Sequence, residues 1–218
     1  MATVTARSTL ADVAAAVADA LHRAGIVAVL TGGACATFYS DGVYQSHDLD
    51  FIVRSGGTRR SLDEAMAAIG FARQHDRYVH PASPFFVEFP RGPLAIGDDV
   101  EITPVTIAVG RGRTLALSPT DACRDRLAAF YYWIDRQSLQ VAVAIARRQR
   151  VDLTSIERWS VREGQADKFQ EFKRELSRGS VVTTAIREPS SKTARAARPA
   201  RTTRRSDRET PDRRRRAR

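Results

Sequence analysis

Two aspartates one residue apart are the strongest chemical signal in this sequence. Residues 49–53 form an apolar stretch typical of a short strand, and Asp48 and Asp50 lie at its start. Side chains alternate along a strand, so the two carboxylates share one face while Leu49 and Phe51 point to the other. Adjacent carboxylates repel each other unless a divalent cation such as Mg²⁺ lies between them. We therefore predict a metal site, with turn and helix-capping roles as the structural alternative.

A pair of glycines stands upstream of these aspartates. The apolar run of residues 26–30 stops at Gly32 and Gly33, which predicts a buried strand that enters a tight turn. Residues 34–39 then favour a short helix. The N–H groups at the start of a helix are suited to phosphate oxygens, so this turn is a candidate phosphate-binding site.

A third acidic residue stands in another apolar stretch. Glu88 is the charged residue of residues 85–89, which we predict to be a strand. An isolated charge in such a strand is costly unless it is paired or binds a metal. We therefore predict that Glu88 joins the two aspartates, with a solvated strand face as the alternative.

At these positions the sequence resembles the nucleotidyltransferase superfamily of the DNA polymerase β type. The superfamily pattern is an apolar residue, Gly-Gly or Gly-Ser, a spacer, and Asp-x-Asp on a strand. The resemblance implies metal ions, Mg²⁺ with Mn²⁺ as an alternative, held by three catalytic carboxylates: Asp48, Asp50 and Glu88. It also implies four nucleotide-binding residues: Thr31, Gly32, Gly33 and Ser46. For Ser46, an ordinary loop hydroxyl is the alternative.

The elements that must position these residues alternate between helix and strand. Residues 10–21 repeat apolar side chains at helical spacing, with Ser8 or Thr9 as the N-cap and Gly25 as the end. Residues 61–69 form a second such helix. Further strands are predicted at residues 77–80, 85–89, 100–102, 106–109 and 115–117. The expected fold class is α/β (α+β), a mixed-sheet nucleotidyltransferase core over residues 1–117 with helices on one face.

The character of the chain changes at Ser118. With Ser118 as N-cap and Pro119 as the first helical residue, a helix is predicted to start here, and helical spacing continues to residue 177. We therefore predict a C-terminal helical bundle over residues 118–177, three or four helices long and packed on the sheet.

Residues 118–137 carry a second resemblance, to the second half of AbiE-type toxin nucleotidyltransferases and their uncharacterised bacterial relatives. In that group a helix carries a basic residue, often Lys. The resemblance implies that Arg124 takes the Lys position and that Arg124 and Arg136 bind nucleotide phosphates. Arginine does not exchange a proton near neutral pH, so only charge stabilisation is expected. The alternative is a structural ion-pair network of Arg124, Asp125, Arg126, Asp135 and Arg136.

The positive charge of the protein is concentrated at its C-terminus. Residues 178–218 hold 14 basic and 4 acidic residues, which accounts for the whole net charge of +10. Ser, Thr, Pro, Ala and Arg dominate this segment without periodicity, so we predict a disordered Arg-rich tail. Such a tail would bind nucleic acid through its phosphates, with a solvated tail that lacks a dedicated partner as the alternative.

Together these features predict an enzyme that transfers a nucleotide from an NTP to an acceptor hydroxyl. The toxin resemblance implies tRNA as the acceptor, contacted by the basic tail, and an antitoxin partner. Two alternatives stay open: a catalytically inactive nucleotidyltransferase-like protein that binds nucleotide or RNA, and a small-molecule enzyme of the aminoglycoside-modifying type. Cys35 and Cys123 predict reduced thiols, and no membrane-span or signal pattern is present, so a cytoplasmic protein is expected.

Overall fold

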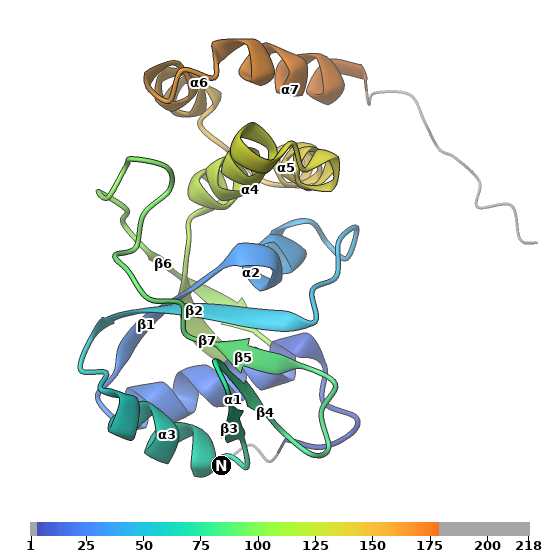
Figure 1. Ribbon diagram of the computed structural model, residues 1–218. Coiled ribbons are helices and arrows are strands. Elements are labelled where there is room, and N and C mark those ends of the chain that lie inside the picture. The colour runs from blue at the N-terminus through green and yellow to red at the C-terminus, as the bar shows by residue number, and fades with distance from the viewer. Residues whose placement is uncertain (1–3, 179–218) are drawn as a thin grey trace, which may run out of the picture. The chain divides into compact units, whose positions relative to one another are not determined.

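The computed structural model describes residues 4–178 (Figure 1). Within this range the chain forms a seven-stranded mixed sheet and seven helices, so the predicted α/β mixed-sheet fold is confirmed. The Arg-rich tail lies outside the described residues, except that Arg178 is the last residue of helix α7 (Ala166–Arg178). Among the described residues, no helix is both long and apolar enough to cross a membrane.

The sheet has β1 (Val27–Thr31) and β2 (Asp48–Ser55) near its centre, in the order β3-β4-β5-β2-β1-β7-β6. β1 and β2 are antiparallel, whereas β2 pairs with β5 and β1 pairs with β7 in parallel. The remaining strands are β3 (Ala72–Gln74), β4 (Arg77–Val79), β5 (Phe86–Glu88), β6 (Val105–Val109) and β7 (Gly112–Ala116). Strand β3 escapes prediction because all three of its residues are exposed and show no apolar alternation.

The strand predicted at residues 100–102 is wrong. Residues 100–104 have no regular structure, and Val100 is 62% exposed. The backbone N–H of Glu101 donates to the Asp99 carboxylate at 3.0 Å instead of to a neighbouring strand. This short apolar run is therefore part of the loop that joins β5 to β6.

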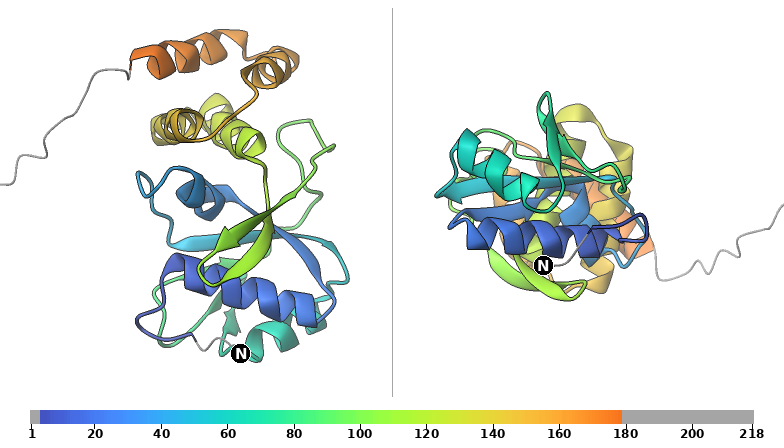
Figure 2. Two further views of the ribbon diagram at one scale, coloured as in Figure 1. Left: turned by 180° about the vertical axis from the view of Figure 1, so that it is seen from behind. Right: turned by 90° about the horizontal axis from the view of Figure 1, so that it is seen from below.

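Helices cover both faces of the sheet, which corrects the prediction of one covered face (Figures 1 and 2). Helices α1 (Leu10–Arg23) and α3 (Arg59–Ala67) pack together on one face, and α2 (Gly32–Tyr39) lies on the other. Helix α2 is mostly buried because it contacts the sheet as well as α4 and α5. Its small apolar side chains suit this middle layer, since a helix enclosed on several sides needs no polar face.

Two local predictions are confirmed. Thr9 is the N-cap of α1, where its side chain accepts from the Asp12 N–H and the Asp12 carboxylate accepts from the Thr9 N–H. Cys35 and Cys123 are free and buried. Their thiols therefore fill the core and form no cross-link.

Four helices follow the sheet: α4 (Pro119–Trp133), α5 (Arg136–Arg148), α6 (Leu153–Arg162) and α7. Ser118 caps α4 as predicted. Ile134 ends α4 with a φ of +55°, and the chain turns back so that α5 packs against α4. Buried aromatic side chains fill this helical part: Phe130, Tyr131, Trp159, Phe169 and Phe172. Because α4 and α5 also contact α2, the helical part and the sheet lie within one compact unit.

Candidate active site

Strand β1 passes into α2 at Gly32 with no residue between them. Gly32 has a φ of +62°, a left-handed conformation that other residues rarely adopt. A Cβ atom at residue 32 would also overlap the carboxylate oxygen Oδ2 of Asp50. A Cβ atom at Gly33 would lie 2.6 Å from Ser46 Oγ and 3.2 Å from the Tyr44 hydroxyl oxygen. The glycine bend, Gly32 and Gly33, therefore comes into direct contact with the segment that carries the aspartates.

Asp48 and Asp50 lie on one face of β2. Leu49 and Phe51 are fully buried on the opposite face, whereas both aspartates are partly exposed, as strand alternation predicts. Thr31 pairs with Asp50 across β1 and β2, and its hydroxyl donates to the Asp50 backbone carbonyl at 3.4 Å. The last residue of β1 thus fixes the backbone of the second aspartate beside the glycine bend.

Ser46 holds the first aspartate in place. Its side chain is buried, and its hydroxyl donates to the Asp48 carboxylate. Its backbone N–H donates to Thr37 Oγ1 at 3.1 Å, and the Thr37 hydroxyl donates to the Gly33 carbonyl at 3.0 Å. Ser46 therefore lies at the glycine bend, where a nucleotide-binding residue was predicted, and the contact that it makes there orients Asp48.

Glu88 lies beside Asp50 on the neighbouring strand. The parallel register pairs Asp50 with Glu88 and Asp48 with Phe86. Paired residues on adjacent strands point to the same face, so Glu88 shares the face of the aspartates. Burial and the negative charges of Asp76 and Asp48 raise the pKa of Glu88. The structure therefore brings the three predicted acidic residues to one side of the sheet.

Negative charge is concentrated at Asp50. Burial, together with the charges of Asp48 and Glu88, raises the pKa of Asp50 to about 7. Neighbouring carboxylates disfavour one another's ionisation, so this arrangement costs the folded protein stability. A bound cation would remove the repulsion, because its charge reverses the local preference for the protonated acid.

These acids do not form a complete metal centre. No group of three or more His, Cys, Asp or Glu side chains within residues 4–178 is placed to hold a metal ion. The predicted three-carboxylate ligand set is therefore not assembled. Mg²⁺ usually needs only one or two carboxylates, because water and substrate phosphates complete its coordination. Asp48 and Asp50 beside the glycine bend fit a metal ion that binds together with a nucleotide.

Arg126 is close enough to Asp50 for their charges to act on each other, although the sequence suggested it only as part of an ion-pair network. Its guanidinium donates to the Asp125 carboxylate from Nε at 3.0 Å and from Nη2 at 2.6 Å. Burial opposes ionisation of Arg126, but the neighbouring Asp125, Tyr44 and Asp50 outweigh it and raise the pKa. Helical phase was the available signal: Arg124 and Arg126 are about 200° apart around α4, so they face nearly opposite sides.

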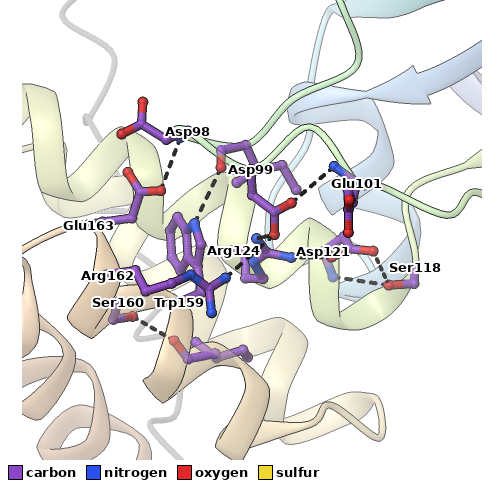
Figure 3. A network of polar contacts seen from close by, with 12 residues as sticks. Asp98, Asp99, Glu101, Ser118, Asp121, Arg124, Trp159, Ser160, Arg162 and Glu163 are labelled. Carbon is purple, nitrogen blue, oxygen red and sulfur yellow. Dashed lines mark hydrogen bonds and ion pairs between the residues drawn. The ribbon is translucent and has the colours of Figure 1, made fainter.

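Arg124 belongs to a buried network that joins α4 to α6 and to the loop before β6 (Figure 3). Its guanidinium donates to Asp121 at 2.9 Å and to Asp99, and it lies 5.0 Å from the centre of the Trp159 ring. Arg162 approaches the same Asp99 carboxylate at 3.7 Å. Burial disfavours the ionised form of Asp99, but the hydrogen bonds from Arg124 and the Glu101 backbone N–H, together with the charges of Arg124 and Arg162, outweigh burial and lower the pKa of Asp99. Arg124 is thus committed to a structural network, although its acidic partners are not the predicted ones.

Arg136 lies at the exposed start of α5. It forms an ion pair with Glu171 of α7, and its guanidinium lies 5.5 Å from the centre of the Phe130 ring. In the described part of the chain, neither Arg124 nor Arg136 forms a hydrogen bond or ion pair with Asp48, Asp50 or the glycine bend. Their predicted contact with nucleotide phosphates gains no support from these positions, and we do not place them in the site.

No protein-family model matches the chain, and no curated protein matches it. Among solved structures, the chain is similar to an antigenic nucleotidyltransferase-like protein from Paracoccidioides brasiliensis. Their identity is 16% over 78% of this chain and 88% of that chain, with a TM-score of 0.50. The chain therefore shares the overall fold of that protein.

A second match has a lower structural similarity. It is the antibiotic-resistance factor ANT(2'')-Ia, with 14% identity, coverage of 75% of this chain and 92% of that chain, and a TM-score of 0.43. At 16% identity the likeness to the Paracoccidioides brasiliensis protein concerns the fold, so the activity of this chain has to be argued from its own side chains.

Proposed function

We propose that this protein is an enzyme that transfers a nucleotide from a nucleoside triphosphate to an acceptor hydroxyl. The observation that carries the proposal is the contact between Asp50 and Gly32. It places a carboxylate, with Asp48 on the same strand face, directly against a glycine bend at the start of a helix. The N–H groups of a helix start suit phosphate oxygens, and a carboxylate pair suits the Mg²⁺ that accompanies them.

In the proposed reaction, the acceptor oxygen attacks the α-phosphorus of the triphosphate. The bond from the α-phosphorus to the oxygen that bridges to the β-phosphate breaks, and pyrophosphate leaves. The hydroxyl proton passes to the Glu88 carboxylate, which lies beside Asp50 in the strand register. Ser46 keeps the Asp48 carboxylate in one orientation. Mg²⁺, or Mn²⁺ in its place, would be held by Asp48 and Asp50 and would supply positive charge to the phosphates.

We propose that Arg126, instead of Arg124 and Arg136, binds the negatively charged triphosphate. Asp125 orients the Arg126 guanidinium with two hydrogen bonds. A guanidinium carries five N–H donors, so further donors stay available for phosphate oxygens. The charges of both Asp125 and Arg126 act on Asp50, which supports a location of this ion pair close to the acidic face.

The acceptor in this proposal is RNA. This proposal is supported by the positive charge of residues 178–218, which contain 14 basic and 4 acidic residues. Such a segment attracts nucleic acid with an affinity that falls as salt rises. The resemblance to AbiE-type toxins is what favours tRNA among RNAs and an antitoxin as a protein partner.

The test combines the full chain with Mg²⁺, each α-labelled NTP in turn and total bacterial RNA, and measures label in the RNA. We expect labelling by the wild type and a loss of at least about a hundredfold in Asp48→Asn and Asp50→Asn, since removal of a charge-stabilising group costs that much. Melting temperatures show whether each variant is folded. Asp19→Asn, which changes an exposed carboxylate on α1, is the matched control and should label RNA normally.

Two outcomes would contradict the proposal. Label retained in both aspartate variants rejects this site as the catalytic one. Tight NTP binding without release of pyrophosphate, with every RNA and every NTP, favours the catalytically inactive alternative.

A further inference from the structure

The hydroxyl group of Tyr44 lies at the glycine bend. Tyr44 belongs to the loop of residues 40–47 that joins α2 to β2. Its hydroxyl oxygen is 3.2 Å from the position that a Cβ atom at Gly33 would take, and Ser46 Oγ is 2.6 Å from that position. Glycine at residue 33 therefore leaves room for two hydroxyl groups beside the start of α2. Ser46 uses its hydroxyl to hold Asp48.

Tyr44 differs from the other tyrosines of the chain in its hydrogen bonding. Four of the five tyrosine hydroxyls bond to another residue: those of Tyr39, Tyr78, Tyr131 and Tyr132. The hydroxyl of Tyr44 forms no hydrogen bond with any residue between 4 and 178, although its side chain is partly buried and packs against the core. The core thus holds the Tyr44 side chain in place and leaves its hydroxyl available to a ligand.

Arg126 lies on another side of the same region. Burial lowers the pKa of its guanidinium, but the charges of three neighbouring groups outweigh burial and raise it: Asp125, Tyr44 and Asp50. Tyr44 is therefore close to the guanidinium as well as to the glycine bend. Segments that are far apart in the sequence, the bend, the loop before β2 and α4, bring these groups together next to the acidic face.

We propose that Tyr44 is a substrate-binding residue, whose hydroxyl donates to the β- and γ-phosphates of the NTP, the part that leaves as pyrophosphate. The inference rests on the proposed nucleotidyl transfer and adds a residue to that same site. A phenol hydroxyl, a guanidinium and the N–H groups of a helix start are all hydrogen-bond donors. A ligand that satisfies them together needs several acceptor oxygens and negative charge, which a polyphosphate has and a nucleobase or ribose has not.

The order of residues along the bend decides which phosphates meet Tyr44. Gly32 touches Asp50, so the phosphate beside Gly32 is next to the carboxylates where the α-phosphorus has to react. Gly33 is one residue further along and is the glycine that Tyr44 approaches. With the α-phosphate at the carboxylates, the β- and γ-phosphates therefore extend toward Tyr44 and Arg126.

Tyr44 takes no part in the bond changes. Its hydroxyl keeps its proton throughout, and the acceptor hydroxyl forms the new bond to the α-phosphorus while pyrophosphate leaves. The contact with the β- and γ-phosphates is present before and during the reaction, so it stabilises the bound substrate and the transition state about equally. Loss of such uniform binding raises KM and leaves kcat nearly unchanged.

The experiment measures binding to the full chain by calorimetry in the presence of Mg²⁺, which needs no turnover. Four probes are compared: the NTP that the wild type binds most tightly, its nucleoside monophosphate, its nucleoside, and inorganic pyrophosphate. Loss of a hydrogen bond to a charged group costs about a tenfold change in affinity or more. We therefore expect Tyr44→Phe to weaken the NTP and pyrophosphate about tenfold, and to leave the monophosphate and the nucleoside unchanged.

Tyr44→Phe keeps the ring and removes only the hydroxyl. Because that hydroxyl has no partner in the described part of the chain, the melting temperature of Tyr44→Phe should equal that of the wild type. Tyr132→Phe is the matched control, since its hydroxyl bonds to Glu163 at the end of α6 and its affinity for all four probes should be unchanged. In the RNA-labelling assay, Tyr44→Phe should raise KM for the NTP about tenfold with kcat nearly unchanged.

Equal affinities of the wild type and Tyr44→Phe for the NTP and for pyrophosphate overturn the inference, even if RNA is labelled normally. An equal loss for the nucleoside also overturns it, because the contact would then be with the base or the sugar. A wild type that binds neither the NTP nor pyrophosphate rejects the inference together with the proposed function. If both ligands bind in a manner that depends on Tyr44 but no RNA is labelled, the proposed transfer to RNA fails and the phosphate contact stands.

Discussion

Gly32 and Asp50 touch across the junction of β1, β2 and α2, so closely that a Cβ atom at residue 32 would overlap the Asp50 carboxylate. The contact joins the backbone bend to the acidic strand face without an intervening side chain. Any ligand that binds both must fit this single corner, because the bend and the carboxylate are fixed to each other through the sheet.

Gly32→Ala should damage both stability and activity. The substitution forces a residue with a side chain into a φ of +62° and against Asp50, which costs about 1–3 kcal/mol of unfolding free energy. Urea unfolding measures that loss, and RNA labelling measures activity. Gly164→Ala is the control, since its φ is +69° but a Cβ atom there meets nothing. Equal losses in the two variants would show that the contact with Asp50 is irrelevant.

Asp50→Asn should raise stability while it abolishes transfer. In metal-free buffer it removes a charge that burial and two neighbouring carboxylates disfavour, so the unfolding free energy should rise by about 1 kcal/mol. Asp48→Asn should raise the unfolding free energy by less, because it also weakens the hydrogen bond from Ser46. Thermal denaturation near neutral pH checks both variants. A destabilised Asp50→Asn would contradict the repulsion inferred here.

Substitution of Arg124 should mainly reduce stability, whereas substitution of Arg126 should mainly reduce activity. Arg124→Met leaves Asp99 and Asp121 without their buried partner and should cost about 3 kcal/mol of unfolding free energy. Arg126→Met should cost less stability but should lower NTP affinity and the transfer rate by about a hundredfold in total. Denaturant unfolding and NTP titration measure the two effects. The opposite pattern would return Arg124 to the nucleotide site.

The contribution of Tyr78 to the unfolding free energy should depend on pH. The hydrogen bonds from Tyr78 at 2.7 Å and from Arg73 at 2.9 Å lower the pKa of Asp63 below its ordinary value of 3.8. A lowered pKa stabilises the fold fully above 3.8, and this contribution is lost as the pH falls through the lower, folded-state value. The stability difference between the wild type and Tyr78→Phe should therefore be constant near neutral pH and shrink in acid.

Melting temperatures of the wild type and Tyr78→Phe over that pH range provide the measurement. Tyr39→Phe is the control, because the Tyr39 hydroxyl donates at 2.8 Å to the Leu117 backbone carbonyl, which does not titrate in this range. A difference for Tyr78→Phe that persists unchanged at low pH would mean that Asp63 is not the group responsible.

Local patterns were enough to predict the acidic strand face and the glycine bend. Alternation along β2 separates Asp48 and Asp50 from the buried Leu49 and Phe51, and that separation needs only the period of a strand. The helix starts at Thr9 and Ser118 likewise depend on side-chain and backbone groups three residues apart. Such features are settled within a few residues of chain.

Two features depend on contacts between distant segments and could not be predicted. Whether Arg124 or Arg126 points toward the acidic face depends on how α4 is rotated about its axis. Contacts of Arg124 with Asp99 and Trp159, which belong to other segments, help to set that rotation. The cavity lined by Arg59, Arg73 and Arg91 forms only because α3 and the segment after β5 meet around the β3–β4 hairpin. Sequence spacing carries no information about such a meeting.

Because β1 continues into α2 without a linking residue, the glycine bend has no hinge. Hydrogen bonds through Thr37 and Ser46 brace it further against the loop that precedes β2. The glycine bend is consequently held firmly against the strand that carries Asp48 and Asp50, so any adjustment to a bound nucleotide has to come from neighbouring elements such as α4, which carries Arg126. Substitutions that loosen the packing of α4 should therefore alter the turnover rate even where they touch no ligand.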